Sequence, residues 1–164
     1  MSSDCKVVKE TMPELRATIL SWITGFWEGE GCLVFDEPKC DVFIVRLYLS
    51  QTNKEILEWV RQQMYGFGKV RKGWESGWSL IVNKQKEVLT WLREILPYLR
   101  IERNKAKAQL AIQFLESRLS VMGFHPYELN ELKLVKTFCE ISRQTKKKAY
   151  QSVCQTIRSR ENER

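Results

Sequence analysis

The stretch Ile23-Thr24-Gly25-Phe26-Trp27-Glu28-Gly29-Glu30-Gly31 decides the fold of this chain, because the spacing of apolar residues changes across it. Before it, apolar residues recur at the spacing of a helix, and after it they alternate as in a strand. Glu28 and Glu30 therefore stand where a helix runs into a strand, on different helix faces because they are two residues apart. A carboxylate beside the free carbonyls of a helix end suits a hard cation such as Mg²⁺. An ordinary surface acid is the plain alternative.

The helix that carries this stretch follows Pro13, a residue favoured in a first turn, and it has two stripes. One stripe is apolar and is expected to pack on the core: Leu15, Ile19, Trp22 and Phe26. The other is made of small residues: Thr18, Ser21, Gly25 and Gly29. A glycine inside a helix costs about 1 kcal/mol relative to alanine, so two of them one turn apart need a reason. Close approach of another helix is the usual reason, so the pattern predicts a helix buried on two sides.

Residues 32–50 predict a long β-hairpin, with a turn at Glu37-Pro38-Lys39. Its second strand places apolar residues on one face: Phe43, Val45, Leu47 and Leu49. The other face carries Arg46 and Tyr48 among apolar residues.

Further helices and a second hairpin follow. Thr52 with Glu55 is a capping box that starts a helix ended by Gly66. Strands at 69–71 and 78–82 form the second hairpin around Gly73 to Gly77, and Asn83 caps a helix stopped by Pro97. The order α-β-β-α-β-β-α predicts an α+β fold, in which helices cover one face of a four-stranded antiparallel sheet.

The uncovered sheet face is the first candidate binding surface. It carries four polar or basic side chains: Arg46, Tyr48, Lys69 and Arg71. A basic, aromatic-bearing open sheet is typical of proteins that contact DNA grooves with strands, with arginines suited to guanine edges and tyrosine or lysine to bases or phosphates. A solvated face is the alternative.

Charge is distributed unevenly along the chain. Lys and Arg number 27 against 20 Asp and Glu, a formal net charge of +7. Residues 1–99 hold 13 of each sign, so the whole excess lies in residues 100–164. That part is expected to form helices at 104–119 and 127–143 and then a basic tail, 144–164, with Lys146, Lys147 and Lys148 as a phosphate clamp or a solvated end. The excess favours a polyanionic partner, either nucleic acid or a membrane surface. A solubility surplus is the alternative, and charge alone does not decide between the two.

Composition excludes several chemistries. The single histidine, His125, rules out a multi-histidine metal site, and the five cysteines form no C-x-x-C pair, which favours a reducing compartment. No apolar run is long enough to span a bilayer, and residues 1–10 lack the core of a secretory signal. We therefore expect one soluble, intracellular domain over 1–164, in the cytoplasm or an organelle matrix, with residues 1–12 as an N-terminal extension.

The quoted stretch resembles the nine-residue LAGLIDADG motif of the homing endonucleases. Gly25, Gly29 and Gly31 match the small positions of the motif, and glutamates stand at both acidic positions. Other segments over residues 15–160 resemble landmarks of the family: the hairpin at 32–50, Gln51, Gly66-Phe67-Gly68, Leu96-Pro97-Tyr98-Leu99 and Lys146 to Lys148. One copy of the motif is visible, so the chain is similar to the single-motif subgroup, whose members act as homodimers.

The resemblance implies roles for several residues. Glu30 would ligate the catalytic divalent metal, and the carbonyl of Gly29 would add a ligand. Glu28 would hold the crossing of two motif helices. Gln51 would order water near the scissile phosphate. The helices of two copies would meet along the small-residue face, at Thr18, Ser21, Gly25, Glu28 and Gly29.

One family feature is missing. A lysine usually follows the L-P-Y-L-like segment and supports charge in the transition state, but the aligned residue here is Glu102. Arg103 or Lys105 is the candidate replacement.

The resemblance therefore implies an intron-encoded, site-specific endonuclease for double-stranded DNA. It would act as a homodimer on a long pseudo-palindromic target, using Mg²⁺ or another divalent cation such as Mn²⁺ and no small-molecule cofactor. The leading alternative is a nucleic-acid-binding protein of the same fold without cleavage, either an RNA splicing maturase or a transcription regulator. A third hypothesis, a membrane-surface protein, lacks a basic helix with a broad apolar face.

Overall fold

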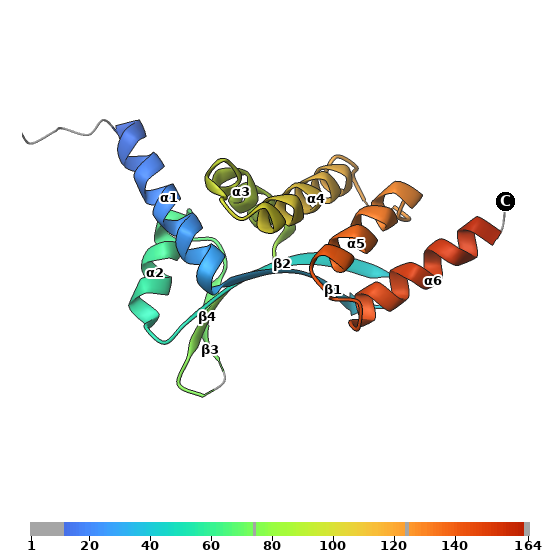
Figure 1. Cartoon of the computed structure of the whole chain (residues 1–164), viewed down its shortest axis with the longest axis horizontal. Helices are drawn as coiled ribbons and strands as arrows, with labels where there is room; N and C mark the ends of the chain where they lie inside the picture. The colour runs from blue at the N-terminus through green and yellow to red at the C-terminus, as the bar shows by residue number, and fades with distance from the viewer. Residues whose placement is uncertain (1–11, 74, 124, 163–164) are drawn as a thin grey trace, which may run out of the picture.

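Six helices and four strands make up the part of the chain that the computed structural model describes, residues 12–73, 75–123 and 125–162 (Figure 1). The first half comprises α1 (Met12–Glu30), β1 (Gly31–Lys39), β2 (Val42–Gln51), α2 (Lys54–Gln63), β3 (Lys69–Lys72), β4 (Trp78–Val82) and α3 (Gln85–Ile95). A short 3₁₀ turn (Leu96–Tyr98) leads to α4 (Glu102–Leu119), α5 (Leu129–Ile141) and α6 (Lys148–Asn162). The predicted α+β class is confirmed. Among the described residues, none of the helices has the length and apolarity that a membrane span needs.

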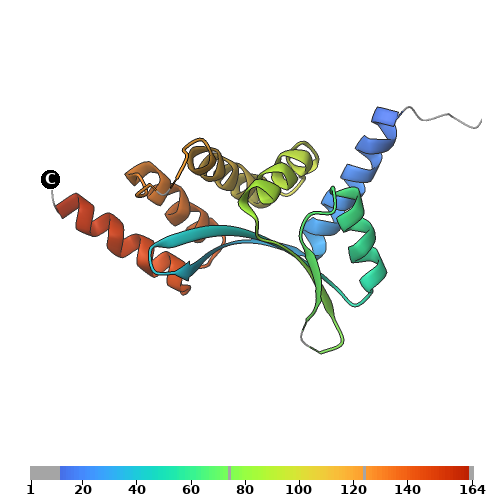
Figure 2. The ribbon, with the colours of Figure 1, turned by 180° about the vertical axis from the view of Figure 1, so that it is seen from behind.

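The sheet has the strand order β1-β2-β4-β3, and every neighbouring pair is antiparallel. Helices α3, α4 and α5 lie on one side of β1 and β2, while the opposite side carries no helix in either view (Figures 1 and 2). The two hairpins are joined through β2 and β4, where Leu49 pairs with Leu80 and Gln51 with Trp78. This pairing brings the end of β2 beside the start of β4.

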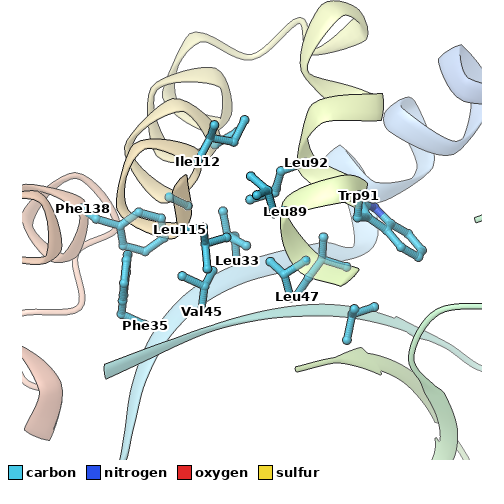
Figure 3. Packing of buried hydrophobic residues seen from close by; sticks show 14 of the residues in the cluster. Leu33, Phe35, Val45, Leu47, Leu89, Trp91, Leu92, Ile112, Leu115 and Phe138 are labelled. Atoms are coloured by element: carbon cyan, nitrogen blue, oxygen red, sulfur yellow. The ribbon is translucent and has the colours of Figure 1, made fainter. Parts of the chain in front are cut away.

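The core lies between this sheet and the helices. The predicted inward residues of β2 are all buried, from Phe43 at 4% exposed to Leu49 at 0%. Figure 3 shows Leu33, Phe35, Val45 and Leu47 of the sheet facing side chains of α3, α4 and α5. Burial of each large apolar side chain contributes about 1.5–3 kcal/mol, so this layer fixes which face of the hairpin points to the helices.

The predicted packing face of α1 is only partly right, because Ile19 and Phe26 are partly buried against the core but do not form its centre. The buried residues are Leu20, Ile23, Thr24 and Trp27. In contrast, Leu15 and Trp22 are 43% and 49% exposed. Both sets recur at helical spacing, so the periodicity alone could not choose between them. The small-residue face is exposed within the chain, so only one of the two expected buried sides is buried here.

Two helix caps differ from the prediction. Asn53, not Thr52, caps α2, because its Oδ1 accepts the backbone N–H groups of Glu55 and Ile56. The residue at the N-cap of α3 is Lys84, and its side chain makes no capping hydrogen bond. Adjacent polar residues compete for a cap, and the tertiary path of the chain selects the one with the right geometry.

The turn of the first hairpin also lies further along the chain than predicted. β1 runs through Pro38 to Lys39, and the turn is at Cys40 and Asp41, where Asp41 has a φ of 57°. A proline is tolerated here because β1 is an edge strand and needs no N–H on its open side. The predicted end of α2 is confirmed, since Gly66 has a φ of 73° and donates its N–H to the carbonyl of Arg61.

Residues 148–162, expected in a basic tail, form helix α6. Ala149, Val153 and Ile157 are buried at intervals of four residues, against α5 and β1. The helix is also attached to the first hairpin through Glu37, whose carboxylate accepts the Ser152 hydroxyl at 2.9 Å and lies 3.7 Å from Lys148 Nζ. The sequence analysis missed this helix because it considered only the basic residues of the segment and not the spacing of Ala149, Val153 and Ile157. The N-terminal extension, apart from Met12, lies outside the described residues.

Candidate functional site

A hollow of about 410 Å³ opens where three elements meet: the end of α1, the end of β2 and the turn between β3 and β4. The residues around it are Glu30, Ser50, Gln51, Thr52, Gly73, Gly77, Trp78 and Ser79. The two residues predicted to be closest to the chemistry, Glu30 and Gln51, therefore lie in one hollow although they are far apart in the sequence. Pairing of Gln51 with Trp78 places the second hairpin on its far wall.

Glu30 is the last residue of α1 and is exposed. Within the described part of the chain, its carboxylate has no hydrogen-bonding or ionic partner. The last four carbonyls of a helix have no partner inside the helix, and that of Gly29 is among them. A carboxylate beside free carbonyls is a donor set for a hard divalent cation, so these residues fit Mg²⁺. One carboxylate is an incomplete set, and the remaining oxygens must come from elsewhere.

Gln51 is held in place by its neighbour. Its Oε1 accepts the backbone N–H of Thr52 at 2.8 Å and the Thr52 hydroxyl at 3.1 Å. With the amide oxygen occupied, the amide NH₂ group is left to donate to a water or an oxyanion. Ser50 and Ser79 add a pair of hydroxyls, 3.0 Å apart, on the same wall.

The open sheet face carries a second, polar hollow of about 180 Å³. All four residues predicted for this face line it, together with two that the sequence analysis did not select: Arg46, Tyr48, Lys69, Arg71, Ile81 and Asn83. Arg46 is not free, because its Nη1 donates to Asp36 Oδ2 at 2.9 Å. Its pKa is raised, first by a hydrogen bond with Tyr48 and then by the Asp36 charge. The face thus presents several cationic side chains, of which Arg46 is held in place by Asp36.

Solved structures with this architecture were compared with the chain. I-CvuI, in a complex with the I-CreI target in 2 mM Mg in which the DNA is not cleaved, has a TM-score of 0.64 and 19% identity over 88% of this chain and 96% of that one. The archaeal intron-encoded homing endonuclease I-Vdi141I, complexed with DNA, has a TM-score of 0.63 and 16% identity over 85% and 96%. The chain has the fold of the LAGLIDADG homing endonucleases. The resemblance seen in the sequence is thereby confirmed.

A third LAGLIDADG structure differs in length. I-SmaMI bound to cleaved DNA has a TM-score of 0.62 and 14% identity, over 77% of this chain but only 47% of its own. No family model matches the sequence, and no curated protein matches it. At such low identity the fold persists because it depends on the pattern of buried residues rather than on their identities.

Glu28, the first acid of the LAGLIDADG-like stretch, is bound within its own chain. Its carboxylate accepts the backbone N–H of Ile101 at 2.9 Å and that of Arg100 at 3.2 Å. Ile101 is the N-cap of α4, so Glu28 satisfies donors at the start of that helix and ties it to the end of α1. Its predicted role in a helix crossing stays a prediction.

Two cations near the start of α4 in the sequence are already engaged. Arg103, the predicted replacement for the family lysine, donates its Nε to the carbonyl of Ile141 at 2.9 Å. Lys107 is only 8% exposed and lies over the Phe138 ring. Burial lowers the pKa of Lys107. The catalytic role of Arg103 stays a prediction.

A cation that the sequence analysis missed lies beside the hollow. Lys54 is the first residue of α2, and its Nζ is 4.8 Å from the centre of the Trp78 ring. Its position three residues after Gln51 was the available signal.

The exposed face of the LAGLIDADG-like helix is smooth. Among the described residues, a Cβ built on Gly25 or Gly29 would meet no atom within 4 Å apart from the backbone of its own helix. Beside this face, a mainly apolar groove of about 540 Å³ runs between α1 and α2 and is lined by Thr18, Ile19, Trp22, Asn53, Glu55, Ile56 and Trp59. Trp22 and Trp59 meet edge to face, 5.2 Å between ring centres.

Lys146, Lys147 and Lys148 lie at the start of α6, and all three are exposed. Because Lys148 is close to Glu37, this cluster lies by the β1–β2 turn, at the opposite end of β1 from Glu30. It is therefore separate from the polar hollow on the sheet.

Proposed function

We propose that the chain is a homodimeric, divalent-metal-dependent endonuclease that cleaves both strands of a long, pseudo-palindromic DNA target, encoded in an intron and used for intron homing. The observation that carries the proposal is the meeting of Glu30 and Gln51 in one hollow at the end of an open, basic sheet. An available carboxylate supplies the chemistry, and the adjacent cationic face supplies a surface for the polyanion.

DNA would lie along the open sheet face. Arginine donors match guanine O6 and N7 in a major groove, so Arg46 and Arg71 suit base contacts. Tyr48 and Lys69 suit bases or phosphates, and Lys146 to Lys148 suit phosphates further along the duplex. The structural neighbours I-Vdi141I and I-CvuI are complexes with DNA, which supports this partner.

The second copy would pack on the exposed face of α1. No contact among the described residues requires Gly25 and Gly29 to be small, although each weakens the helix by about 1 kcal/mol relative to alanine. Close packing against the same helix of a partner provides the reason, and the groove beside it offers apolar area to bury. The lengths agree with this assembly, because the fold accounts for 96% of I-CvuI but 47% of I-SmaMI, a chain with room for two such units.

In the dimer, the two Glu30 carboxylates would come together near the two-fold axis, one for each scissile phosphate. Glu30 and the Gly29 carbonyl would hold a divalent cation, which would supply Lewis-acid stabilisation of charge at the scissile phosphate. Gln51, with its oxygen fixed by Thr52, would donate its NH₂ to the attacking water and orient it. The protein would therefore contribute metal ligands, water orientation and placement of the phosphate.

A nucleic-acid-binding protein without cleavage is the second candidate. Glu102 at the position of the usual lysine favours it, together with the bond that ties Arg103 to the Ile141 carbonyl. The two candidates share the DNA face and differ only in what occurs at the hollow.

Cleavage of a plasmid library with randomised inserts in Mg²⁺, followed by sequencing of the linear products, tests the proposal. Wild type should yield a pseudo-palindromic target that Glu30→Gln binds but does not cut. Glu161→Gln, a matched loss of charge in exposed α6, should cut normally. Selective binding without any cleavage by wild type would favour the second candidate, and absence of selective binding would contradict both.

A further inference from the structure

The turn between β1 and β2 brings together one thiol and two carboxylates. Glu37, Cys40 and Asp41 each offer one ligand atom, and these three atoms all lie within 4.8 Å of one another. Among the described residues, no other three cysteine, histidine or acidic side chains converge in this way. The group lies at the opposite end of β1 from Glu30, so it is separate from the hollow in which cleavage is proposed.

Glu37 has a buried oxygen that lacks a hydrogen bond. Its side chain is 0% exposed, and its Oε2 accepts no hydrogen bond from the described residues. Lys148 forms an ion pair with it, but Nζ is 3.7 Å from Oε2, which is longer than a hydrogen bond. A buried carboxylate oxygen without a hydrogen bond is costly, so this atom points to a further ligand.

The other oxygen of Glu37 holds the carboxylate in place. Oε1 accepts the Asp41 N–H at 2.9 Å and the Ser152 hydroxyl also at 2.9 Å. Hydrogen bonds to a ligating carboxylate orient it toward the metal and are a regular feature of metal sites. Because Oε1 is used in this way, Oε2 is the oxygen that is free to coordinate an ion.

The distance between the thiol and its neighbour fits a tetrahedral ion. Cys40 Sγ lies 3.6 Å from Asp41 Oδ2, and the protonated thiol donates a weak hydrogen bond across this distance. Zinc binds sulfur at about 2.3 Å and carboxylate oxygen at about 2.0 Å, so a tetrahedral angle places the two atoms about 3.5 Å apart. Zinc can therefore replace the thiol proton with little movement. Both residues are exposed, which leaves access for a water as a fourth ligand.

Charge and donor type both favour zinc. Glu37, Asp41 and a Cys40 thiolate carry three negative charges, and Lys148 carries one positive charge. A divalent cation brings this group to neutrality. Mg²⁺ and Ca²⁺ prefer oxygen ligands alone, whereas zinc accepts sulfur and carboxylate oxygen together.

We propose that Glu37, Cys40 and Asp41 bind a structural zinc ion at the end of the first hairpin. One metal–sulfur and two metal–oxygen bonds form, and the Cys40 thiol proton passes to solvent. Glu37 also contacts Ser152 and Lys148 of α6, a helix that lies beside the hairpin (Figure 2). Zinc therefore stabilises the turn to which this helix is attached.

Zinc binding is tested with untagged, full-length protein that has been treated with EDTA, dialysed and kept in a phosphine reductant, with every variant in a Cys5→Ser background. Calorimetric titration should show one Zn²⁺ bound per chain, and Cd²⁺ should give the ultraviolet charge-transfer band of a metal–thiolate bond. Cys40→Ser should abolish the band and weaken Zn²⁺ binding by at least about tenfold, since loss of even an outer partner of a metal site costs that much. Cys32→Ser, an equal loss of an exposed thiol, should keep both.

Asp41→Asn separates coordination from folding. Asn tolerates the φ of 57° at this position, so the turn should persist, but the neutral amide should lower the Zn²⁺ affinity by at least about tenfold. In the parent chain, free Zn²⁺ at about 20 times its Kd should raise the midpoint of thermal unfolding by about 4–7 °C. Cys40→Ser should lack this increase at the same concentration of zinc.

Unchanged Zn²⁺ affinity in either Cys40→Ser or Asp41→Asn would overturn the site, and so would a Kd weaker than about 1 mM in the parent chain. Displacement of the zinc by excess Mg²⁺ would also overturn it, because Mg²⁺ does not favour a sulfur ligand. None of these measurements uses DNA cleavage. Failure of the zinc site therefore leaves the proposed function intact, and failure of cleavage leaves the zinc site intact.

Discussion

Two glutamates at the two ends of β1 have opposite environments. Glu37, near the far end, has a side chain with 0% exposure, accepts the Asp41 N–H and the Ser152 hydroxyl, and lies near Lys148. Glu30, immediately before the strand, is exposed and has no partner within the described residues. Both hydrogen bonds of Glu37 end on Oε1, while its Oε2 is buried and has only the ion pair with Lys148. A carboxylate that its own chain holds in this way stabilises the fold, whereas one left open is available for a ligand. Only six residues lie between the carboxylate that the fold holds and the one that it leaves open.

The largest expected effects come from replacing each of these two glutamates by glutamine, because one change should reduce cleavage and the other should reduce stability. Glu30→Gln should reduce cleavage at least about 1000-fold, because it removes the charged metal ligand, and should change the free energy of unfolding by less than about 0.5 kcal/mol. Glu37→Gln should lower the free energy of unfolding by about 1–3 kcal/mol, because a buried amide replaces a paired carboxylate, and should leave the cleavage rate nearly unchanged. Urea unfolding and single-turnover cleavage measure the two; the same pattern in both variants would refute the contrast.

The glycines near Glu30 also fall into two kinds, one required by the fold of the chain and one that leaves a helix face open. A Cβ on Gly31 would collide with the Trp27 ring and carbonyl, so Gly31→Ala should destabilise the chain by about 1–3 kcal/mol. Gly25 faces open space, so Gly25→Ala should stabilise the isolated chain by about 0.5–1 kcal/mol while weakening the dimer. Urea unfolding at low concentration and sedimentation equilibrium separate these effects. An unchanged dimer for the bulkier Gly25→Leu would show that this helix face is not the interface.

Glu28 lies between these extremes, partly exposed but bonded to the start of α4. Glu28→Gln should cost about 1 kcal/mol of stability, since it weakens a charge-assisted pair of hydrogen bonds at a partly solvated site. Hydrogen exchange at the Arg100 and Ile101 amides should accelerate. Glu102→Gln, in the first turn of α4 but not bonded to these amides, is the control; equal acceleration there would indicate a general effect of charge on the helix end.

The smallest expected effect concerns thiols. Beside Glu37, the Asp41 charge raises the pKa of Cys40, and the thiolate is the reactive form. In a background with Cys5 and Cys32 replaced by serine, Asp41→Asn should therefore speed iodoacetamide labelling of Cys40 at pH 7.5 by about two- to threefold. Burial raises the pKa of Cys139 to about 12, so this cysteine should stay unlabelled until the chain unfolds. Peptide mass spectrometry distinguishes the two sites, and slower Cys40 labelling in Asp41→Asn would contradict the assignment.

Much of the architecture could be predicted because local spacing encodes it. The change from helical to strand period at Gly31 gave the helix–strand boundary, and the alternation in β2 gave the buried face. The resemblance to the LAGLIDADG family singled out Glu30 in the motif and Gln51 at the end of β2, and the structure places both in one hollow.

Features that depend on distant partners escaped prediction. The buried side of α1 is set by contacts with β1, β2 and α3, and two stripes of equal period gave no means to choose. Helix α6 was not predicted, because polar and charged residues separate its apolar residues, Ala149, Val153 and Ile157. These residues stabilise the helix only when α5 and β1 bury them.

The sequence by itself determined the order of elements, the open basic sheet face and the acid at the helix–strand junction. These follow from periodicity and residue chemistry, which act within a few residues. Only the tertiary structure decided that Glu28 is used by the chain, that Glu30 is left open, and that Lys54 lies against Trp78 beside it. Those outcomes depend on strand pairing and helix packing between segments far apart in the chain, which no local pattern records.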